Sequence, residues 1–447
     1  MVPNRDIMRA VEQLHYRVTA GDVAAQAGMD LQLAEQGLLT LASEVGGHMQ
    51  VSETGELAYV FPRGMQGILQ GKYFRLRLQK WWSQIWRVLF YLIRVSFGVV
   101  LIASLVLIVL TLIIIAIALS AASSQNRDND RGGGGGFGPV FLPRLWIGPD
   151  WFYLFSPGYG RRSYERRQFR GRDGQMSFLE SIFSFLFGDG NPNTNLEERR
   201  WQAIATTIRN NGGSVVAEQI SPYLDNLGNG SSRDLEDYML PVLSRFNGRP
   251  EVSPEGDLIY RFPELQVMAE EHQATPVPAY LKETPWQFSA ASSTQKMWAI
   301  SLGGINLVAA LALWRALQDR EVVSILAQIM AEAGFAGSVV SFTTGIFGFL
   351  LAYGVAFLGI PLARYFWIQW RNKRIEARNE ERQERAIALN EADNTVQRKL
   401  TYASEFATRT IVSARDLAYT TEEDLTEQEL AQKDKIDEDW RRRLESH

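Results

Sequence analysis

Residues 51–62 read VSETGELAYVFP, and residues 252–263 read VSPEGDLIYRFP. Seven of the twelve positions are identical, and an eighth keeps an acidic side chain. In both stretches apolar and polar residues alternate around a glycine, Gly55 or Gly256, at which a tight turn needs a positive φ. The pattern predicts a β-hairpin that occurs twice in the chain.

Three helical patterns precede each hairpin. In the first copy they lie in RDIMRAVEQLHY, VTAGDVAAQAG and DLQLAEQGLLTLASEV, with Thr19 as a helix cap. In the second copy the helices are expected to start at Trp201 and to continue in SVVAEQISPYL and RDLEDYMLPVLSRF. Three helices and a hairpin are typical of a winged helix, so residues 1–65 and 195–266 are predicted to be two winged-helix-like repeats. The aromatic residues of the second strands are predicted to lie in the core: Tyr59, Phe61, Tyr260 and Phe262.

Both repeats are acidic. Residues 3–63 contain four basic and eight acidic residues, and residues 197–265 contain seven and eleven, so each has a net charge of −4. In DNA-binding winged helices the third helix enters the major groove, and basic side chains neutralise phosphates. The corresponding segment of the first repeat, residues 30–45, has no basic side chain. The charge therefore argues against nucleic acid and favours protein partners.

Three apolar segments are long enough to cross a bilayer. Residues 95–122 contain no charged side chain, and about 20 apolar residues suffice for one helical span. Residues 297–317 and 336–361 are predicted to be the second and third transmembrane segments. The residues between these two are expected to form a loop on the outer side of the membrane.

Small side chains recur on one face of the third segment, where they let helices approach closely in lipid. This face is expected to pack on the second segment beside Gly303 and Gly304, or to form a homo-oligomer contact. No acidic side chain lies deep in a span, which argues against proton-coupled transport but leaves a simple pore open. The residues of the face are Gly337, Ser341, Gly345, Gly348, Ala352 and Ala356.

The flanking charges give an inconsistent topology. Residues 66–94 form a basic, aromatic collar, and basic residues also follow the third segment, so both regions are expected on the cytoplasmic or stromal side. Three membrane crossings, however, would place these two regions on opposite sides of the membrane. Either Trp81 to Ala122 is a helical hairpin broken near Gly98, or the aromatic stretch at 137–160 enters the bilayer.

The remaining segments are expected to link these parts or to contact the membrane. Residues 123–190 form a loop with a glycine run and a basic run at 161–172 that could bind anionic lipid headgroups or RNA, or remain solvated. Residues 177–188, SFLESIFSFLFG, suit an interfacial helix. Residues 267–296 are predicted to be a linker, and residues 362–447 a charged helical tail.

The composition excludes several kinds of chemistry. The chain has no cysteine, which excludes disulfides and thiolate ligands. No motif of a nucleophile with its base or of a phosphate-binding loop is present. No catalytic, cofactor-binding or metal-binding residue is predicted, and the chain is expected not to be an enzyme. The four histidines include no pair with metal-ligand spacing: His15, His48, His272 and His447.

The stretch EDYMLPVLSRFNGRPEVSPEGDLIYRFPELQ resembles a family of integral membrane proteins of cyanobacteria and plastid envelopes. The order of soluble repeat, span, aromatic and glycine-rich loop, second repeat, two spans and charged tail is similar to that family too. The resemblance implies a photosynthetic organism and a plasma or thylakoid membrane, or the plastid inner envelope in related proteins. Members are loosely labelled iron–sulfur cluster biosynthesis proteins, which in a chain without cysteine implies an indirect role such as docking another component.

The sequence as a whole predicts a mainly α membrane protein with two winged-helix-like repeats, three transmembrane segments and a charged C-terminal helix. The working hypothesis is a membrane-anchored scaffold or assembly factor that recruits protein partners through the third helices and hairpins of its repeats. Two alternatives stay open, a membrane-tethered transcription regulator and a channel or transporter subunit.

Overall fold

The chain folds into a mainly helical structure with two compact units. Unit 1 consists of Met1–Trp81, Pro192–Pro285 and Lys373–His447, and unit 2 of Trp82–Asn191 and Trp286–Asn372. The computed structural model describes residues 4–72, 74–125, 177–228, 235–270, 274–331, 334–412 and 417–428, together with 430, 433, 440 and 441. The glycine run, the aromatic stretch at 137–160 and the basic run at 161–172 lie outside these ranges, so their expected membrane contacts stay predictions.

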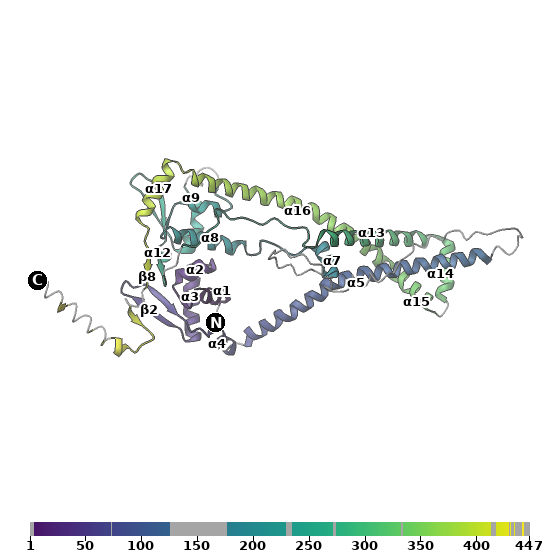
Figure 1. Cartoon of the computed structure of the whole chain (residues 1–447), viewed down its shortest axis with the longest axis horizontal. Helices are drawn as coiled ribbons and strands as arrows, with labels where there is room; N and C mark the ends of the chain where they lie inside the picture. The colour runs from purple at the N-terminus through teal and green to yellow at the C-terminus, as the bar shows by residue number, and fades with distance from the viewer. Residues whose placement is uncertain are drawn as a thin grey trace, which may run out of the picture. The chain divides into compact units, whose positions relative to one another are not determined.

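The N-terminal module, residues 4–72, consists of three helices, a β-hairpin and a further short helix (Figure 1). Thr19 and Asp22 form a capping box at the start of the second helix, in which each side chain accepts a hydrogen bond from the other residue's backbone N–H. Gly28 ends that helix with a φ of +62°, which glycine adopts without strain. The elements are α1 (Arg5–Gln13), β1 (Arg17–Val18), α2 (Ala20–Ala27), α3 (Leu31–Val45), β2 (His48–Ser52), β3 (Leu57–Val60) and α4 (Met65–Lys72).

The central module, residues 195–268, also contains helical segments followed by a hairpin. Its first helix begins at Leu196, five residues before the predicted start. Proline breaks up the other two predicted helices, because Pro222 and Pro241 have no N–H to donate, and short 3₁₀ turns appear there. The elements are α8 (Leu196–Asn210), β4 (Ser214–Val215), α9 (Ala217–Ile220), η1 (Ser221–Tyr223), η2 (Asp237–Met239), α11 (Leu240–Phe246), β5 (Arg249–Val252), β6 (Leu258–Arg261), α12 (Pro263–Gln266) and β7 (Val267–Met268).

The two hairpins pair in the same register. His48 pairs with Val60 in the N-terminal module, and Arg249 pairs with Arg261, both 201 residues further along the chain. The short strand ahead of the second helix joins the same hairpin strand in each module, so that β1 pairs with β3 and β4 pairs with β6. The predicted core aromatics are confirmed, since none is more than 4% exposed: Tyr59, Phe61, Tyr260 and Phe262.

The two modules are joined through one hydrophobic core and several polar contacts. Asp22 of α2 is 1% exposed and forms an ion pair with Arg209 of α8. Arg245 donates a hydrogen bond to the carbonyl oxygen of Gly28 at 2.7 Å, and its guanidinium lies 4.4 Å from the ring centroid of Trp201. Buried charges need such partners, so these contacts fix the packing of α2 on α8.

The C-terminal tail, residues 362–447, is not simply a charged helix. After α17 (Asn394–Glu405) it supplies two strands to unit 1, β8 (Thr410–Ile411) and β9 (Leu417–Thr420). β8 pairs with β7, and β9 pairs with β2, which gives the sheet order β1-β3-β2-β9. An edge strand leaves unpaired N–H and C=O groups, and the tail satisfies those of β2.

Unit 2 is built from apolar helices (Figure 1). Three helices are long and apolar enough to cross a membrane, namely Gln84–Ala122, Ser293–Ala316 and Phe347–Asn390. The predicted interfacial helix forms as α7, but it buries Ile182, Phe185 and Leu186 against the other helices of the unit. The elements are α5 (Phe74–Gln125, which begins in unit 1), α7 (Phe178–Phe187), α13 (Ser293–Ala316), α14 (Arg320–Ala331), α15 (Phe335–Gly345) and α16 (Phe347–Asn390, which ends in unit 1).

The first transmembrane segment, predicted at residues 95–122, is part of one continuous helix, α5. The alternative of a helical hairpin broken near Gly98 is therefore wrong. Gly98 instead makes room for α7, because a Cβ atom there would lie 2.7 Å from Cδ2 of Leu179. The other explanation of the topology, an excursion of the aromatic stretch into the bilayer, concerns residues outside the described ranges.

The third segment, predicted at residues 336–361, is divided between α15 and α16, which are separated at Ile346. The helix does not stop at Pro361 but continues to Asn390. A proline inside a helix removes one N–H donor and kinks or breaks many helices, but apolar membrane helices tolerate it. The expected loop between the second and third segments contains a helix, α14.

The contact between α13 and α16 uses fewer of the small residues than predicted. A Cβ atom on Gly303 would lie 2.4 Å from Cδ1 of Phe357, and Gly354 faces Leu307. A Cβ atom on Gly345 or Gly348 would meet no atom within 4 Å. The predicted face therefore does not mediate this contact as a continuous stripe, and its use in a homo-oligomer stays a prediction.

A polar contact adds to the packing of the apolar helices. Asn306 of α13 is completely buried. Its Nδ2 donates a hydrogen bond to Oγ of Ser104 on α5 at 2.8 Å. Such an interhelical bond contributes roughly 0.6 kcal/mol on average in membrane proteins, so close packing around Gly303 matters at least as much.

Replacing Gly303 and Gly304 by alanine should have opposite effects. We expect Gly303→Ala to destabilise the protein by about 1–3 kcal/mol, because the added methyl group overlaps the ring of Phe357. Gly304 has no neighbour within 4 Å of its Cβ position, so Gly304→Ala should be neutral or stabilise the helix by up to about 1 kcal/mol. Unfolding of the full chain in detergent measures both, and equal effects would contradict the packing of α13 on α16.

Candidate protein-contact site

Three arginines on one face of α16 contact other residues of unit 1. Arg378, Arg382 and Arg385 are spaced by four and three residues, which places them on the same side of a helix. The side chain of Arg382 is 2% exposed, donates to the carbonyl oxygen of Leu281 at 2.8 Å and to Oε1 of Glu283 at 2.8 Å, and pairs with Asp225. The guanidinium is thus neutralised where it lies, as a charge removed from water requires.

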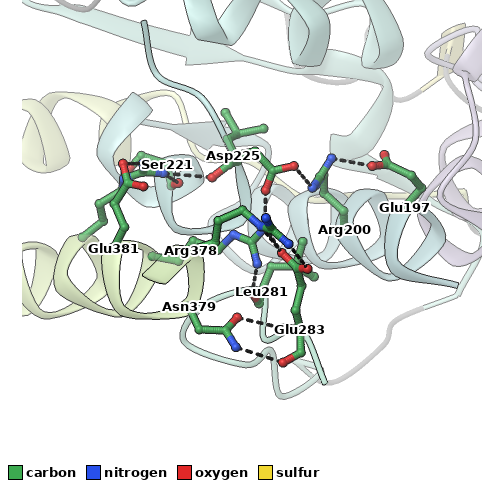
Figure 2. Close-up of polar contacts among 12 residues, drawn as sticks. Glu197, Arg200, Ser221, Asp225, Leu281, Glu283, Arg378, Asn379 and Glu381 are labelled. Carbon is green, nitrogen blue, oxygen red and sulfur yellow. Dashed lines mark hydrogen bonds and ion pairs between the residues drawn. The ribbon is translucent and has the colours of Figure 1, made fainter. Parts of the chain in front are cut away.

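Glu283 is held on both its side chain and its backbone. Arg378 donates Nε to Oε1 at 2.8 Å and Nη2 to Oε2 at 2.6 Å, which is a bidentate ion pair. Asn379 accepts a hydrogen bond from the backbone N–H of Glu283 and donates one to its carbonyl oxygen, both at 2.9 Å. Figure 2 shows these contacts side by side. The segment around Glu283 is therefore fixed to successive residues of α16.

Asp225 extends the network to α8. Its carboxylate pairs with Arg382 and with Arg200, and Arg200 also donates to Oε1 of Glu197 at 2.6 Å (Figure 2). Burial by itself raises the pKa of Asp225 and of Glu283, but their arginine partners outweigh it, so that each pKa lies below its ordinary value. Both carboxylates are consequently ionised anchors, and the arrangement holds the helix rather than transferring protons.

The tail makes a second contact with the hairpin side of the central module through α17. Lys399 donates to Oε1 of Glu218 at 3.0 Å and to Oε1 of Glu236 at 2.8 Å. Tyr260 donates its hydroxyl hydrogen to Oε2 of Glu236 at 2.8 Å. Burial lowers the pKa of Lys399 by itself, but the two carboxylates reverse this and raise it. The lysine is therefore held in its charged form.

The neighbouring residues of α17 complete this contact. Arg398 lies 3.9 Å from Asp257 near the hairpin turn. Ala403, which is 3% exposed, packs with Val216 and Ile259, both of which are fully buried. The hairpin, β4 and the start of α9 in the central module, together with Glu236, thus form a surface that binds a helix of the same chain.

The third helix and the hairpin of the N-terminal module carry apolar side chains that are exposed in unit 1. Leu33 and Leu39 of α3 are 60% and 45% exposed, and Leu57 of the hairpin is 39% exposed. α3 contains no basic residue and begins after the acidic Asp30. An apolar and acidic surface of this kind suits a protein partner that offers apolar and basic side chains.

The described part of the chain contains no cluster suited to a metal ion. Within those residues no group of three or more His, Cys, Asp or Glu side chains could hold a metal ion. The sequence predicted no catalytic, cofactor-binding or metal-binding residue, and the buried carboxylates described above already have cationic partners.

The sequence contained a signal for the arginine network, although the network itself was not predicted. The spacing of Arg378, Arg382 and Arg385 marks one helical face. Because charges of both signs alternate along residues 362–447, the sequence predicts only a charged helical tail here. The acceptors Asp225 and Glu283 lie about 100 residues or more earlier in the chain, and no local pattern links them to α16.

These features define a mainly helical protein with three helices that are long and apolar enough to cross a membrane. The chain is 35% identical over 435 residues to the Arabidopsis thaliana protein named "Uncharacterized protein At5g03900, chloroplastic". The aligned region covers 94% of this chain and 79% of that protein. The chain belongs to the family of this chloroplastic protein. No family model and no solved structure matches it.

Removing the central arginine of the network should destabilise unit 1. We expect Arg382→Gln to cost about 3–5 kcal/mol, because it removes one cationic partner from the buried carboxylate of Glu283. Arg398→Gln is the matched control, since this arginine is 60% exposed and 3.9 Å from its partner, and should cost about 0–1 kcal/mol. Hydrogen exchange of residues 373–390 in the full chain measures how firmly this part of α16 is held. Similar protection in both variants would contradict the role of Arg382 in holding the helix.

The stability of unit 1 should fall at acidic pH. A carboxylate whose pKa is lowered by folding contributes stability that is complete above its unfolded pKa, about 4, and is lost as the pH falls through the folded pKa. Asp225 and Glu283 are such groups. We expect the thermal midpoint to be steady from pH 7 to about pH 5 and to decrease below about pH 4. The decrease should be smaller in Glu283→Gln, and an unchanged pH profile in that variant would refute this assignment.

Proposed function

We propose that the chain is a membrane-anchored scaffold or assembly factor that recruits protein partners to a bilayer surface through two acidic winged-helix modules. The observation that carries the proposal is the contact of Lys399 with Glu218 and Glu236, in which acidic residues of one module already bind a basic helix. In the N-terminal module, α3 presents the exposed side chains of Leu33 and Leu39, through which the module would contact a separate protein.

The order of the elements supports the assignment of both modules as winged helices. Each has helical segments, a short strand ahead of the second helix, and a hairpin whose second strand lies between the other two strands. The hairpins have the same register, and Gly55 and Gly256 have φ of +87° and +90° at the turn. Duplication of one module is the simplest account of these common features.

Charge favours protein over nucleic acid as the partner. α3 contains no lysine or arginine to neutralise phosphates, and a net charge of −4 on residues 3–63 repels a polyanion. In the central module, four acidic residues form ion pairs with basic residues of α16 and α17. This module thus already uses its acidic residues to bind basic side chains of a helix. A membrane-tethered transcription regulator remains the alternative that duplex binding would support.

The membrane anchor would be formed by the three long apolar helices. The name of the Arabidopsis relative places that protein in the chloroplast, and we propose a plastid or thylakoid membrane, or the plasma membrane of a cyanobacterium, for this chain. If the family serves iron–sulfur cluster assembly, as the resemblance implies, a chain without cysteine would act by docking another component. We propose no enzymatic activity.

Site-specific photo-crosslinking in native membranes tests this function. A photoreactive phenylalanine at Leu33, which is 60% exposed, should give discrete protein adducts. The same residue at Leu38, which is fully buried on the same helix, is the control and should give no intermolecular adduct. Proteins linked at Leu33 and not at Leu38 would support the proposal.

Two results would replace the proposal with one of its rivals. Salt-sensitive binding of the full chain in detergent to a DNA duplex near 150 mM salt, without protein adducts at Leu33, would support a transcription regulator. Ion or solute flux through the reconstituted chain, again without adducts, would support a channel or transporter subunit.

A further inference from the structure

Two of the three acidic residues that hold Lys399 and Arg398 in the central module, Glu236 and Asp257, have counterparts in the N-terminal module. The hairpins correspond at a separation of 201 residues, and the acidic residue of the third-helix segment lies at the same separation. In each module burial and this nearby glutamate raise the pKa of the hairpin tyrosine. The corresponding residues are Glu35 and Glu236, Glu56 and Asp257, and Tyr59 and Tyr260.

In the N-terminal module these residues line an open cavity of about 340 Å³. Glu35, Glu56 and Tyr59 lie in its wall, and Glu264 of α12 adds a third carboxylate. No lysine or arginine is among its described lining residues. Burial and the nearby Glu264 raise the pKa of Glu56, so a cation in this cavity would relieve an unfavourable charge.

Tyr59 supplies an independent indication that the cavity takes a ligand. It is 1% exposed, lines the cavity, and its hydroxyl makes no hydrogen bond with any residue that the structure describes. Its counterpart Tyr260 is bonded to Glu236, which in turn accepts a bond from Lys399. The N-terminal module therefore has the glutamate and the tyrosine of this arrangement without the amine.

The open part of this surface suits a single side chain rather than a whole helix. In the central module the apolar part of α17 packs on Val216 and Ile259. The corresponding part of the N-terminal module is already covered, because Ala58 packs with Val267 and Val412 and all three are buried. The acidic part alone stays open, and a protruding basic side chain would fit it.

We propose that this cavity binds a lysine or arginine side chain of a partner protein, in the way that the central module binds Lys399. The carboxylates of Glu35, Glu56 and Glu264 accept hydrogen bonds from the cation, and the hydroxyl of Tyr59 bonds to Glu35 as that of Tyr260 does to Glu236. In assigning the occupant to a separate protein, this inference rests on the proposed function.

A peptide with the sequence of residues 397–400, acetylated and amidated as Ac-QRKL-NH₂, tests the cavity directly. Its binding to the full chain in detergent can be followed by saturation-transfer NMR. We expect saturable binding that weakens about threefold for each of Glu35→Gln, Glu56→Gln and Glu264→Gln, and that is undetectable in the triple variant. The peptide Ac-QQQL-NH₂ should not bind.

Two matched variants distinguish the cavity from general electrostatic attraction. Glu53→Gln removes one negative charge from the same hairpin outside the cavity lining and should leave the affinity unchanged. Glu236→Gln alters the central module and should also leave it unchanged. Absence of saturable binding, an unchanged affinity in the triple variant, or equal weakening by Glu53→Gln would each overturn the proposal.

The C-terminal residues of the same chain are the other candidate that could fill the cavity, and they have to be distinguished from a partner protein. If the peptide binds only after residues 429–447 have been removed, the tail fills the cavity and the assignment to a partner protein is wrong. Failure of the peptide with protein adducts still formed at Leu33 would overturn this inference alone. Loss of those adducts as well would overturn the proposed function.

Discussion

A guanidinium that is almost completely removed from water has to be neutralised by the groups around it, and Arg382 sets this requirement for unit 1. Its partners come from separate parts of the chain, with Asp225 after the second helix of the central module and Glu283 in the segment that follows β7. Leaving the buried carboxylate of Glu283 or the arginine alone would cost several kcal/mol. The network therefore fixes the rotation of α16 about its own axis against the central module.

The tail arginines and lysine also change the electrostatics of the modules. Counted along the sequence, each module has a net charge of −4. In the folded chain, four acidic residues of the central module pair with bases of α16 and α17, whereas the cavity of the N-terminal module has only acidic side chains as charged lining residues. Two modules of equal formal charge thus present different surfaces, because the ion pairs that the described tail residues form with module carboxylates involve the central module.

Local sequence predicted the parts of the fold that depend on near neighbours. The capping residue Thr19 and the turn glycines Gly55 and Gly256 are where expected, because their roles need only the adjacent backbone. The apolar helices are also predictable, since a long uncharged run has few alternatives to a membrane helix. The break at Ile346 and the continuation of α16 through Pro361 could not be predicted from the sequence, because neighbouring helices determine whether such irregularities are tolerated.

The sequence by itself determined the two hairpins, their aromatic core, the three apolar helices and the absence of thiolate chemistry, because periodicity, glycine and composition act within short stretches. The tertiary structure decided which charges meet. Glu236 and Glu35 are alike in sequence position, but one holds Lys399 and the other lines an open cavity. That difference arises from where a distant basic helix packs, which is determined by long-range burial and charge pairing rather than by any local pattern.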